Sequence, residues 1–322
     1  MARESVVAVL GDLNWDLLFF VPELPKRGGE TLSAKSQLRL GGAATNTARW
    51  LARLGFEVRL LAAVGTDPLG DLAARELEKN GISSRFLRRV PERTGICCAI
   101  VDERGERTLF TGRGANTLLS PPLPEGFLEG AEWLHISGYA LLETGSRRAV
   151  EEALFRARSR GIPVSLDPGM VAVHGHGAHL DEISPVDVFL PNEEEARALF
   201  GGEVLPASAF ARKKYGEQVF LKHGERGCFV WDGENLWHIP AISVEVRHSL
   251  GAGDAFNAGV IAAALWGGSS LAQGILGNAL GALCVAGLPA EPATVLGLLG
   301  KIELPEAREV ERLVRAHWRA LG

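Results

Sequence analysis

The sharpest chemical signal in this sequence is the run Gly-Ala-Gly-Asp at residues 251–254, which directly precedes an apolar helix predicted over Ala255–Trp266. Small residues at a helix N-terminus leave backbone N–H groups and the positive end of the helix dipole free for a phosphate. Asp254 lies in the first turn, where its carboxylate can act as the base for a bound hydroxyl. An ordinary helix start with a favourably placed Asp is the alternative. The run is not a Walker A loop, and Phe256 at the third glycine position excludes a dinucleotide fingerprint.

A second group of polar residues and glycines lies near the N-terminus. Gly41 and Gly42 precede a predicted helix, and two glycines allow the backbone to approach a small ligand. Asn46, in the first turn of that helix, can donate and accept hydrogen bonds with hydroxyls. Asn14 and Asp16 follow the first predicted strand and add groups suited to sugar hydroxyls. Taken separately, each piece also fits a tight turn or a helix start.

A third cluster, Asn192 and Glu195, follows a short apolar strand that ends in a proline. An amide and a carboxylate at positions i and i+3 share one helix face, where they can order Mg²⁺-bound waters near phosphates. Acidic residues that complement the dipole of a helix N-terminus are the alternative interpretation.

Two other sets of potential metal ligands occur. His174, His176 and His179 are closely spaced, but they lie among glycines, and we interpret them as part of a polar loop. The four cysteines are too few and too scattered for a disulfide framework or a zinc site, so we interpret them as small buried hydrophobic residues. They are Cys97, Cys98, Cys228 and Cys284.

Strand and helix patterns alternate along most of the chain and must position these residues. This order predicts an α/β fold, a doubly wound and mostly parallel sheet with helices on both faces, in which ligands bind at the carboxyl ends of the strands. The last third of the chain, from Ala252, is mainly helical. Strands are predicted over Val6–Gly11, Val58–Val64, Leu134–Ser137, Val164–Asp167, Val186–Leu190 and Val219–Lys222, and helices over Ala43–Leu54, Pro68–Asn80, Gly145–Arg160, Asn192–Phe200 and Pro305–Ala320.

Two β-rich patches without helical periodicity, at about 16–40 and 84–112, interrupt this alternation. We expect them to pair into a small separate sheet that covers one edge of the main domain as a lid. No internal repeat or linker is evident, so residues 1–322 are predicted to form one domain with the lid segments inserted. Exposed strand edges on such a lid favour pairing, which predicts a homodimer.

Charge and hydropathy exclude several classes of protein. The chain has 322 residues and a formal net charge of −5, which argues against a nucleic-acid-binding protein. The longest apolar stretch, Ile275–Leu288, contains an asparagine and is shorter than the ~18 residues of a membrane span. The segment Met1–Leu10 lacks the long apolar core of a signal peptide. We therefore predict a soluble, cytoplasmic protein with no nucleic-acid or membrane partner.

Taken together, these motifs resemble the PfkB/ribokinase family of ATP-dependent sugar and nucleoside kinases. The resemblance spans nearly the whole chain and rests on the order and spacing of several motifs, each of which is weak alone. They are GDLNWD at 11–16, Gly41-Gly42-x3-Asn46, LARLG at 51–55, VGxDxxG at 64–70, GAN at 114–116, Asn192-x2-Glu195, Lys222-x-Gly224-x2-Gly227, the GAGD run at 251–254 and the helix that contains Asn278.

The resemblance implies a Rossmann-like domain with a β lid, and transfer of the γ-phosphoryl group of ATP to a hydroxymethyl group of a small sugar or sugar acid. It implies that Asp254 is the base and that the backbone N–H groups of Gly251, Ala252 and Gly253 form the anion hole. It also implies further roles by position. The sugar would be held by Asn14, Asp16, Gly41, Gly42, Asn46 and Glu143, the nucleotide by Asn192, Lys222, Gly224, Gly227 and Asn278, and Mg²⁺, through water, by Asn192 and Glu195.

Two positions depart from the family pattern. His248 stands where the family usually has an Asp that helps to bind a monovalent cation, so the resemblance leaves a potassium site unsupported. Ala43 stands where ribokinases have a Lys after the glycine pair, which argues against ribose as the acceptor. The alternatives are a nucleoside kinase of the same family and a sugar-binding protein that has lost turnover.

Overall fold

The computed structural model describes residues 5–103, 107–173, 177–200 and 215–318. Its central sheet has eight strands in the order β14-β13-β12-β11-β10-β9-β1-β4. The strands from β12 to β4 pair in parallel, and β13 and β14 extend the sheet antiparallel, which confirms the predicted mostly parallel sheet. The strands are β1 (Val6–Leu10), β4 (Glu57–Leu61), β9 (Ala131–Ser137), β10 (Val164–Asp167), β11 (Val186–Phe189), β12 (Gly216–Lys222), β13 (Cys228–Trp231) and β14 (Leu236–Ile239).

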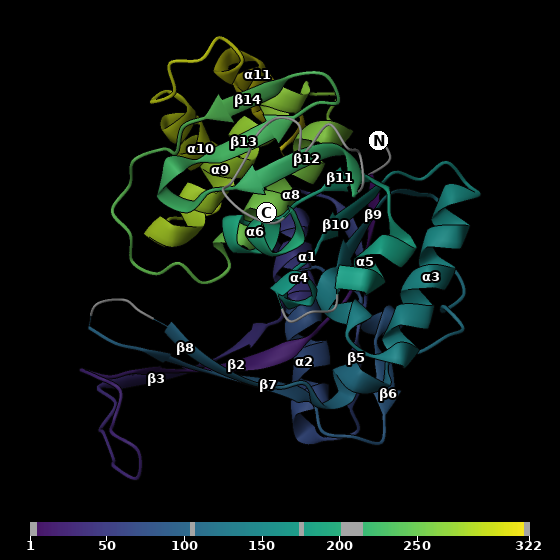
Figure 1. Cartoon of the computed structure of the whole chain (residues 1–322), viewed down its shortest axis with the longest axis vertical. Coiled ribbons are helices and arrows are strands. Elements are labelled where there is room, and N and C mark those ends of the chain that lie inside the picture. The colour runs from purple at the N-terminus through teal and green to yellow at the C-terminus, as the bar shows by residue number, and fades with distance from the viewer. Residues whose placement is uncertain (1–4, 104–106, 174–176, 201–214, 319–322) are drawn as a thin grey trace.

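Helices cover both faces of this sheet (Figure 1). Side chains along β1 alternate between two hydrophobic clusters, with Val7 and Val9 in one and Val6, Ala8 and Leu10 in the other. A strand buried on both faces must be apolar throughout, which explains the uninterrupted run. The first cluster is covered by α1 (Ala43–Arg53), α2 (Pro68–Lys79), α8 (Ala252–Leu265), α9 (Ser270–Ala286), α10 (Pro292–Leu299) and α11 (Ala307–His317), and the second by α3 (Thr144–Arg158), α4 (Met170–Val173), α5 (Gly177–Ile183) and α6 (Glu193–Phe200).

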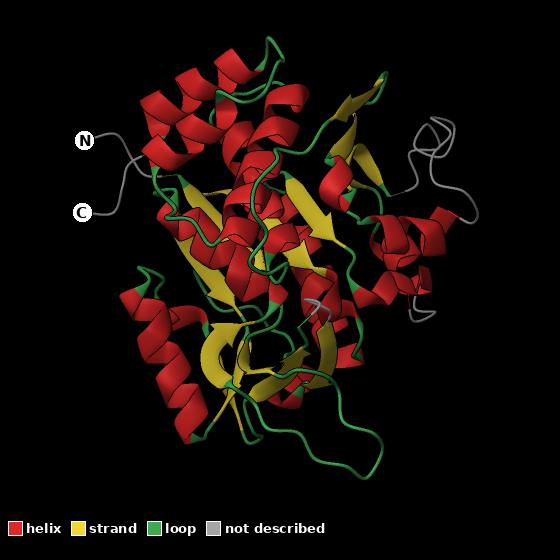
Figure 2. Cartoon of the chain, turned by 90° about the vertical axis from the view of Figure 1, so that its left-hand side faces the viewer, coloured by secondary structure: helices red, strands yellow, loops and turns green. Residues whose placement is uncertain are grey.

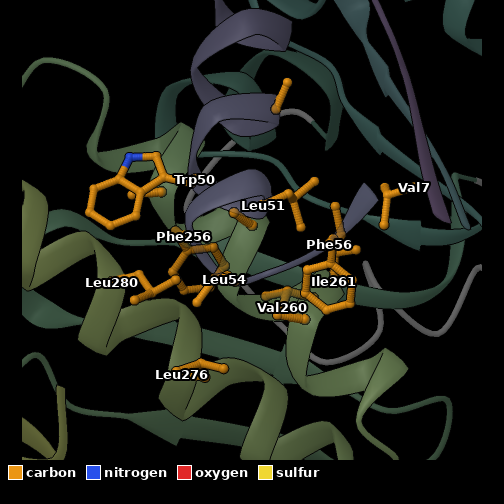
Figure 3. Close-up of a cluster of buried hydrophobic side chains, with 14 of the residues drawn as sticks. Val7, Trp50, Leu51, Leu54, Phe56, Phe256, Val260, Ile261, Leu276 and Leu280 are labelled. Carbon is orange, nitrogen blue, oxygen red and sulfur yellow. The ribbon is translucent and has the colours of Figure 1, made fainter. Parts of the chain in front are cut away.

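Helix α8 is apolar nearly all round because it is enclosed by α1 and α9. Close packing against α9 depends on glycine, since a Cβ at Gly259 would lie 2.8 Å from the backbone of Gly277. Phe256, Val260 and Ile261 of α8 pack beside Leu276 of α9 (Figure 3). This packing fixes the direction of α8 and therefore the place of its N-terminus. In the described part of the chain, no helix is both long and apolar enough to cross a membrane.

Four strands form a second sheet, which we call the lid, in the order β3-β2-β7-β8. β2 pairs antiparallel with β3 and parallel with β7, and β7 and β8 form a hairpin. The lid projects from the lower left of the body in Figure 1, and in Figure 2 its strands form a curved group below the central sheet. The lid strands are β2 (Asn14–Phe20), β3 (Lys35–Gly41), β7 (Gly95–Val101) and β8 (Arg107–Gly112).

Two sequence predictions need correction here. The run Val58–Val64 is not one strand, because β4 ends at Leu61 in the central sheet and the next strand, β5 (Ala63–Gly65), pairs with β6 (Arg88–Val90) in a separate two-stranded sheet. The second lid segment therefore does not begin at residue 84. Residues 84–90 contain a short 3-10 helix and β6, both packed on the body, and the lid resumes at Gly95.

Candidate active site

A cavity of about 890 Å³ lies between the carboxyl edge of the central sheet, the N-terminus of α8 and the lid. Strand ends β10 and β12 contribute Asp167 and Lys222, and the lid contributes Cys97 and Thr111. The structure brings most of the predicted site residues into this one cavity. Those that line it are Asn14, Asp16, Gly42, Asn46, Asn192, Glu195, Lys222, Gly224, Gly227, Gly251, Ala252, Gly253, Asp254 and Asn278.

Asp254 faces the cavity from the first turn of α8, whose N-cap is Gly251 at a φ of 82°. Only glycine adopts this left-handed backbone without strain. Asn46 Nδ2 donates a hydrogen bond to Asp254 Oδ2 at 2.9 Å, which joins α1 to α8. Burial, together with the nearby charge of Asp167, raises the pKa of Asp254 to about 7. A carboxyl group with such a pKa can accept a proton near neutral pH.

The first backbone N–H groups of α8 have no acceptor within the helix, as at any helix N-terminus. The side chain of Lys222 lies against this turn, since a Cβ at Gly253 would be 3.7 Å from Lys222 Nζ. The cavity is thus positively polarised beside the Asp254 carboxylate. An anion such as a transferring phosphoryl group fits this position.

Lys222 is held by two residues that the sequence analysis missed, Asp167 and Asn257. Lys222 Nζ lies 2.7 Å from Asp167 Oδ2 and 3.3 Å from Asn257 Oδ1, and Asn257 Nδ2 donates to Asp167 Oδ2 at 2.6 Å. Burial would raise the pKa of Asp167, but the Lys222 charge and the hydrogen bonds from Lys222 and Asn257 together outweigh it, so the pKa is lowered. Burial would lower the pKa of Lys222, but Asp167 and Glu195 raise it. The pair is therefore charged, and the one available signal was the position of Asp167 at the end of a predicted strand.

Asn192 and Glu195 form a reciprocal cap at the start of α6. The Asn192 backbone N–H donates to Glu195 Oε2 at 2.8 Å, the Asn192 amide donates to Oε1 at 2.8 Å, and the Glu195 N–H donates to Asn192 Oδ1 at 2.9 Å. This is the capping arrangement that the alternative interpretation predicts. The Glu195 carboxyl nevertheless faces the cavity.

The carboxyl groups of Glu195 and Asp167 could hold a divalent cation. Burial and the charge of Asp167 raise the pKa of Glu195 to about 7, so two acids oppose each other at this edge. A bound cation relieves such opposition, and Mg²⁺ typically keeps several waters and uses one or two carboxylates plus phosphates. The residues present therefore fit a water-mediated Mg²⁺. In the described ranges no group of three or more His, Cys, Asp and Glu residues forms a metal site. His174 and His176 lie outside those ranges, and His179 is on α5.

Asn14 and Asp16 are not in a turn, because they open strand β2 of the lid. Asn116 Nδ2 donates to Asn14 Oδ1 at 2.8 Å and so fixes the orientation of that amide. A Cβ at Gly41, which pairs with Asn14 in register, would overlap the Asp16 carboxylate. Burial raises the pKa of Asp16 to about 6, against the opposing charges of Arg39 and Arg49. Gly41 thus makes room for Asp16.

Two predicted sugar contacts, Gly41 and Glu143, are missing from the described residues that line the cavity. Gly41 instead packs against the Asp16 carboxylate, which leaves no room for a Cβ at this position. Glu143 lies at the start of α3, where its Oε1 is 3.3 Å from Arg113 Nη1. Arg113 Nη2 also lies 3.2 Å from Oδ1 of the buried Asp12. This arginine therefore connects Glu143 to the cavity wall.

The other end of the cavity is mainly apolar and is organised by two glycines. Gly224 and Gly227 have φ values of 58° and 94°, and a Cβ at Gly227 would overlap the Ile239 carbonyl. Asn278 Nδ2 donates to the carbonyls of Ile239 at 3.1 Å and Pro240 at 3.2 Å, which fixes the loop after β14. Such a slot suits a flat, largely apolar ring system. Its apolar lining includes Ala241, Ile242, Val244, Val246, Ala282 and Val285.

The chain matches a known protein family and a known fold. Residues 5–290 match the family model described as pfkB family carbohydrate kinase. The chain is 30% identical over 277 residues to the ATP-dependent ribose-1-phosphate kinase of Halopiger xanaduensis, an alignment that covers 85% of this chain and 89% of the relative. It is also similar to the crystal structure of ribokinase from Thermotoga maritima, with a TM-score of 0.75, 25% identity and coverage of 97% and 100% of the two chains. A putative ribokinase II from E. coli, solved in complex with ATP and Mg²⁺, shares the fold at a TM-score of 0.76 and 22% identity, over 98% of this chain and 100% of that one.

Proposed function

Because this chain belongs to the pfkB family of carbohydrate kinases, we propose that it transfers the γ-phosphoryl group of ATP to a hydroxymethyl group of a small sugar or sugar acid. The observation that carries this proposal is the position of Asp254, with a pKa of about 7, beside the free N–H groups of α8 and Lys222. Phosphoryl transfer requires positioning and charge stabilisation more than covalent chemistry. These groups supply both.

In the proposed reaction, Asp254 removes the proton of the acceptor hydroxyl as its oxygen attacks the γ-phosphorus. The N–H groups of Gly251, Ala252 and Gly253 stabilise the charge on the transferring group, and ADP leaves. Asn14, Asp16, Gly42 and Asn46 hold the acceptor against the base, and Lys222 and the slot around Gly224, Gly227 and Asn278 hold the nucleotide. Asn192 and Glu195 would hold Mg²⁺ through water, and the ion would supply positive charge to the phosphates.

Three finer features belong to the same proposal. The lid covers the acceptor end and excludes water, which would otherwise accept the phosphoryl group. The departure at His248 supports a reaction without a monovalent cation. The use of ATP as donor supports a cytoplasmic location.

We also propose a homodimer formed through the outer face of the lid. Leu38, Ile96 and Phe110 are 50%, 40% and 59% exposed, and they share that face with the half-buried Leu17 and Cys98. An exposed apolar patch on one face of a sheet is typical of an interaction site. A second copy of the same face is complementary to it in a two-fold dimer.

The test of the proposed activity is ADP formation with ATP and Mg²⁺ over a panel of sugars, sugar acids and nucleosides. We expect at least one sugar or sugar acid to raise ADP formation far above the rate without acceptor. Turnover of nucleosides alone would instead support a nucleoside kinase. Background rates with every compound, combined with sugar binding in calorimetry, would support a binding protein without turnover.

A further inference from the structure

The inner face of the lid carries two arginines that the proposed phosphoryl transfer does not use. Residues paired across neighbouring strands point to the same side of a sheet, and so do residues two positions apart on one strand. Asp16 pairs with Arg39 on β3 and with Cys97 on β7, and Cys97 pairs with Thr111 on β8. Asp16, Cys97 and Thr111 line the cavity, so this is the face that covers it.

Arg107 lies four residues before Thr111 on β8 and also lines the cavity. Arg107 therefore faces the acceptor end from edge strand β8, whereas Arg39, on the same face of the other edge strand β3, is not among the described residues that line the cavity. Burial and the charges of Arg39 and Arg107 lower the pKa of the His248 imidazole in the loop before α8, so the three groups are near one another. Arg107 thus faces this end of the cavity, with Arg39 and His248 nearby.

Neither guanidinium group is held by a direct contact, although the Asp16 carboxyl lies near Arg39 across the strand pair. Over the part of the chain that the structure describes, neither Arg39 nor Arg107 forms an ion pair or a side-chain hydrogen bond. Other arginines near the cavity are already paired. Arg113 contacts Asp12 and Glu143, and Arg49 donates to the Leu40 carbonyl at 3.0 Å.

From this placement we infer that the acceptor is an anionic sugar, one that carries a phosphate or carboxylate bound by Arg107 and Arg39, and this inference rests on the proposed kinase function. The carboxylates at this end, Asp16 and Asp254, suit the hydroxyl groups of such an acceptor, while two unpaired guanidinium groups suit its anion. The hydroxymethyl group lies at Asp254 and the anionic group lies under the lid. The nucleotide phosphates are not the partner of these arginines, because the α8 N-terminus and Lys222 already face the transfer position.

The test compares acceptors that differ only in the anionic group. ADP formation is measured with pentoses and hexoses, with their 1-phosphates, and with the aldonic acids of the same carbon chains, so that the last two arms distinguish phosphate from carboxylate. We expect kcat/KM for one anionic arm to exceed that of the neutral sugar by roughly 100-fold or more, since two charge-assisted contacts are gained. Equal or higher kcat/KM with the neutral sugars would overturn the inference and leave the proposed function intact.

Arg39→Gln and Arg107→Gln provide the second arm. Each is expected to raise KM for the anionic sugar by about 10- to 100-fold and to leave KM for ATP unchanged, and Arg107→Gln is expected to change kcat/KM for the neutral sugar by no more than about twofold. Arg160→Gln removes the same charge from an exposed position at the end of α3 and is the matched control. A rise in KM for ATP, or equal losses with neutral and anionic sugars, would contradict the inference.

A binding measurement separates the two proposals. The thermal shift caused by a sugar phosphate is measured in the parent, the two arginine variants and the Arg160→Gln control. A shift that is lost in Arg107→Gln but kept in the control, without ADP formation from any sugar, would refute the kinase proposal and retain the anionic ligand. ADP formation with neutral sugars and no shift with any anionic sugar would refute only the inference.

Discussion

At the scale of single residues, Asp254 is the group on which the proposed chemistry depends. Replacing it with Asn keeps the shape of the side chain and a good helix-start residue, but removes the proton acceptor. We expect kcat for Asp254→Asn to fall by about 10²- to 10⁴-fold with much smaller changes in substrate binding. Steady-state kinetics on protein with an unchanged circular dichroism spectrum is the measurement. A variant that keeps more than about a tenth of the parent rate would refute the role of Asp254 as base.

The raised pKa of Asp254 predicts a pH dependence. Because the pKa is about 7, the base is protonated in acid, and kcat should fall about tenfold per pH unit below neutrality. Because the pKa of Asp254 is raised from its ordinary acidic value to about 7, the parent loses stability as the pH rises through this range. Asp254→Asn should therefore have a larger free energy of unfolding than the parent at pH 8, by on the order of a few kcal/mol, and the difference should shrink near pH 4. A stability difference that does not change with pH would contradict the raised pKa.

Glu195 tests the other half of the site. Its carboxyl faces the phosphate end and is capped by Asn192. Glu195→Gln keeps the size of the side chain but removes a charge that attracts Mg²⁺, so we expect higher apparent requirements for Mg²⁺ and ATP and nearly unchanged KM for the sugar. The measurement is the initial rate as Mg²⁺ is varied at saturating sugar, and as sugar is varied at saturating Mg²⁺ and ATP. If Glu195→Gln and Asp254→Asn changed the same kinetic parameter to the same extent, the role proposed for one of the two residues would be wrong.

At the scale of elements, we propose that the junction of β3 and α1 positions the acceptor. Gly41 ends β3, and a Cβ there would overlap the carboxylate of Asp16 on the neighbouring strand. Gly41→Ala should push Asp16 out of position and raise KM for the sugar about tenfold or more, with little effect on KM for ATP. Gly297→Ala is the control, because a Cβ at that position on α10 meets no atom within 4 Å. Unchanged sugar kinetics in Gly41→Ala would show that Asp16 does not hold the acceptor.

At the scale of the whole molecule, the exposed apolar face of the lid predicts assembly. Light scattering should give a mass of twice the 34.5 kDa chain. Phe110→Glu places a charge on the outer lid face, on edge strand β8, and should produce a monomer, because an unpaired charge is costly to bury. Phe155→Glu, at a residue that is 75% exposed on α3, should leave the dimer intact. A parent protein that scatters as a single chain would refute the dimer.

The sequence alone determined the order of strands and helices in the whole molecule. It also determined which polar and small residues stand at the ends of these elements. These signals are local. Apolar runs such as Val6–Leu10 need only neighbouring residues to be recognised, and the small residues before α8 mark a helix N-terminus wherever that helix lies. The family resemblance then supplied roles for residues that local patterns leave ambiguous, such as Lys222, which the structure lines up along the same cavity.

The tertiary structure decided which of these groups meet, because the contacts involved join residues far apart in the chain. Asn46 reaches Asp254 across 208 positions, and Asn257 reaches Asp167 across 90. No periodicity encodes such pairs, and they exist only because parallel strands align their carboxyl ends and α8 packs between α1 and α9. The same reason applies to Glu143, because the partner that it contacts, Arg113, comes from a segment whose position only the folded chain defines.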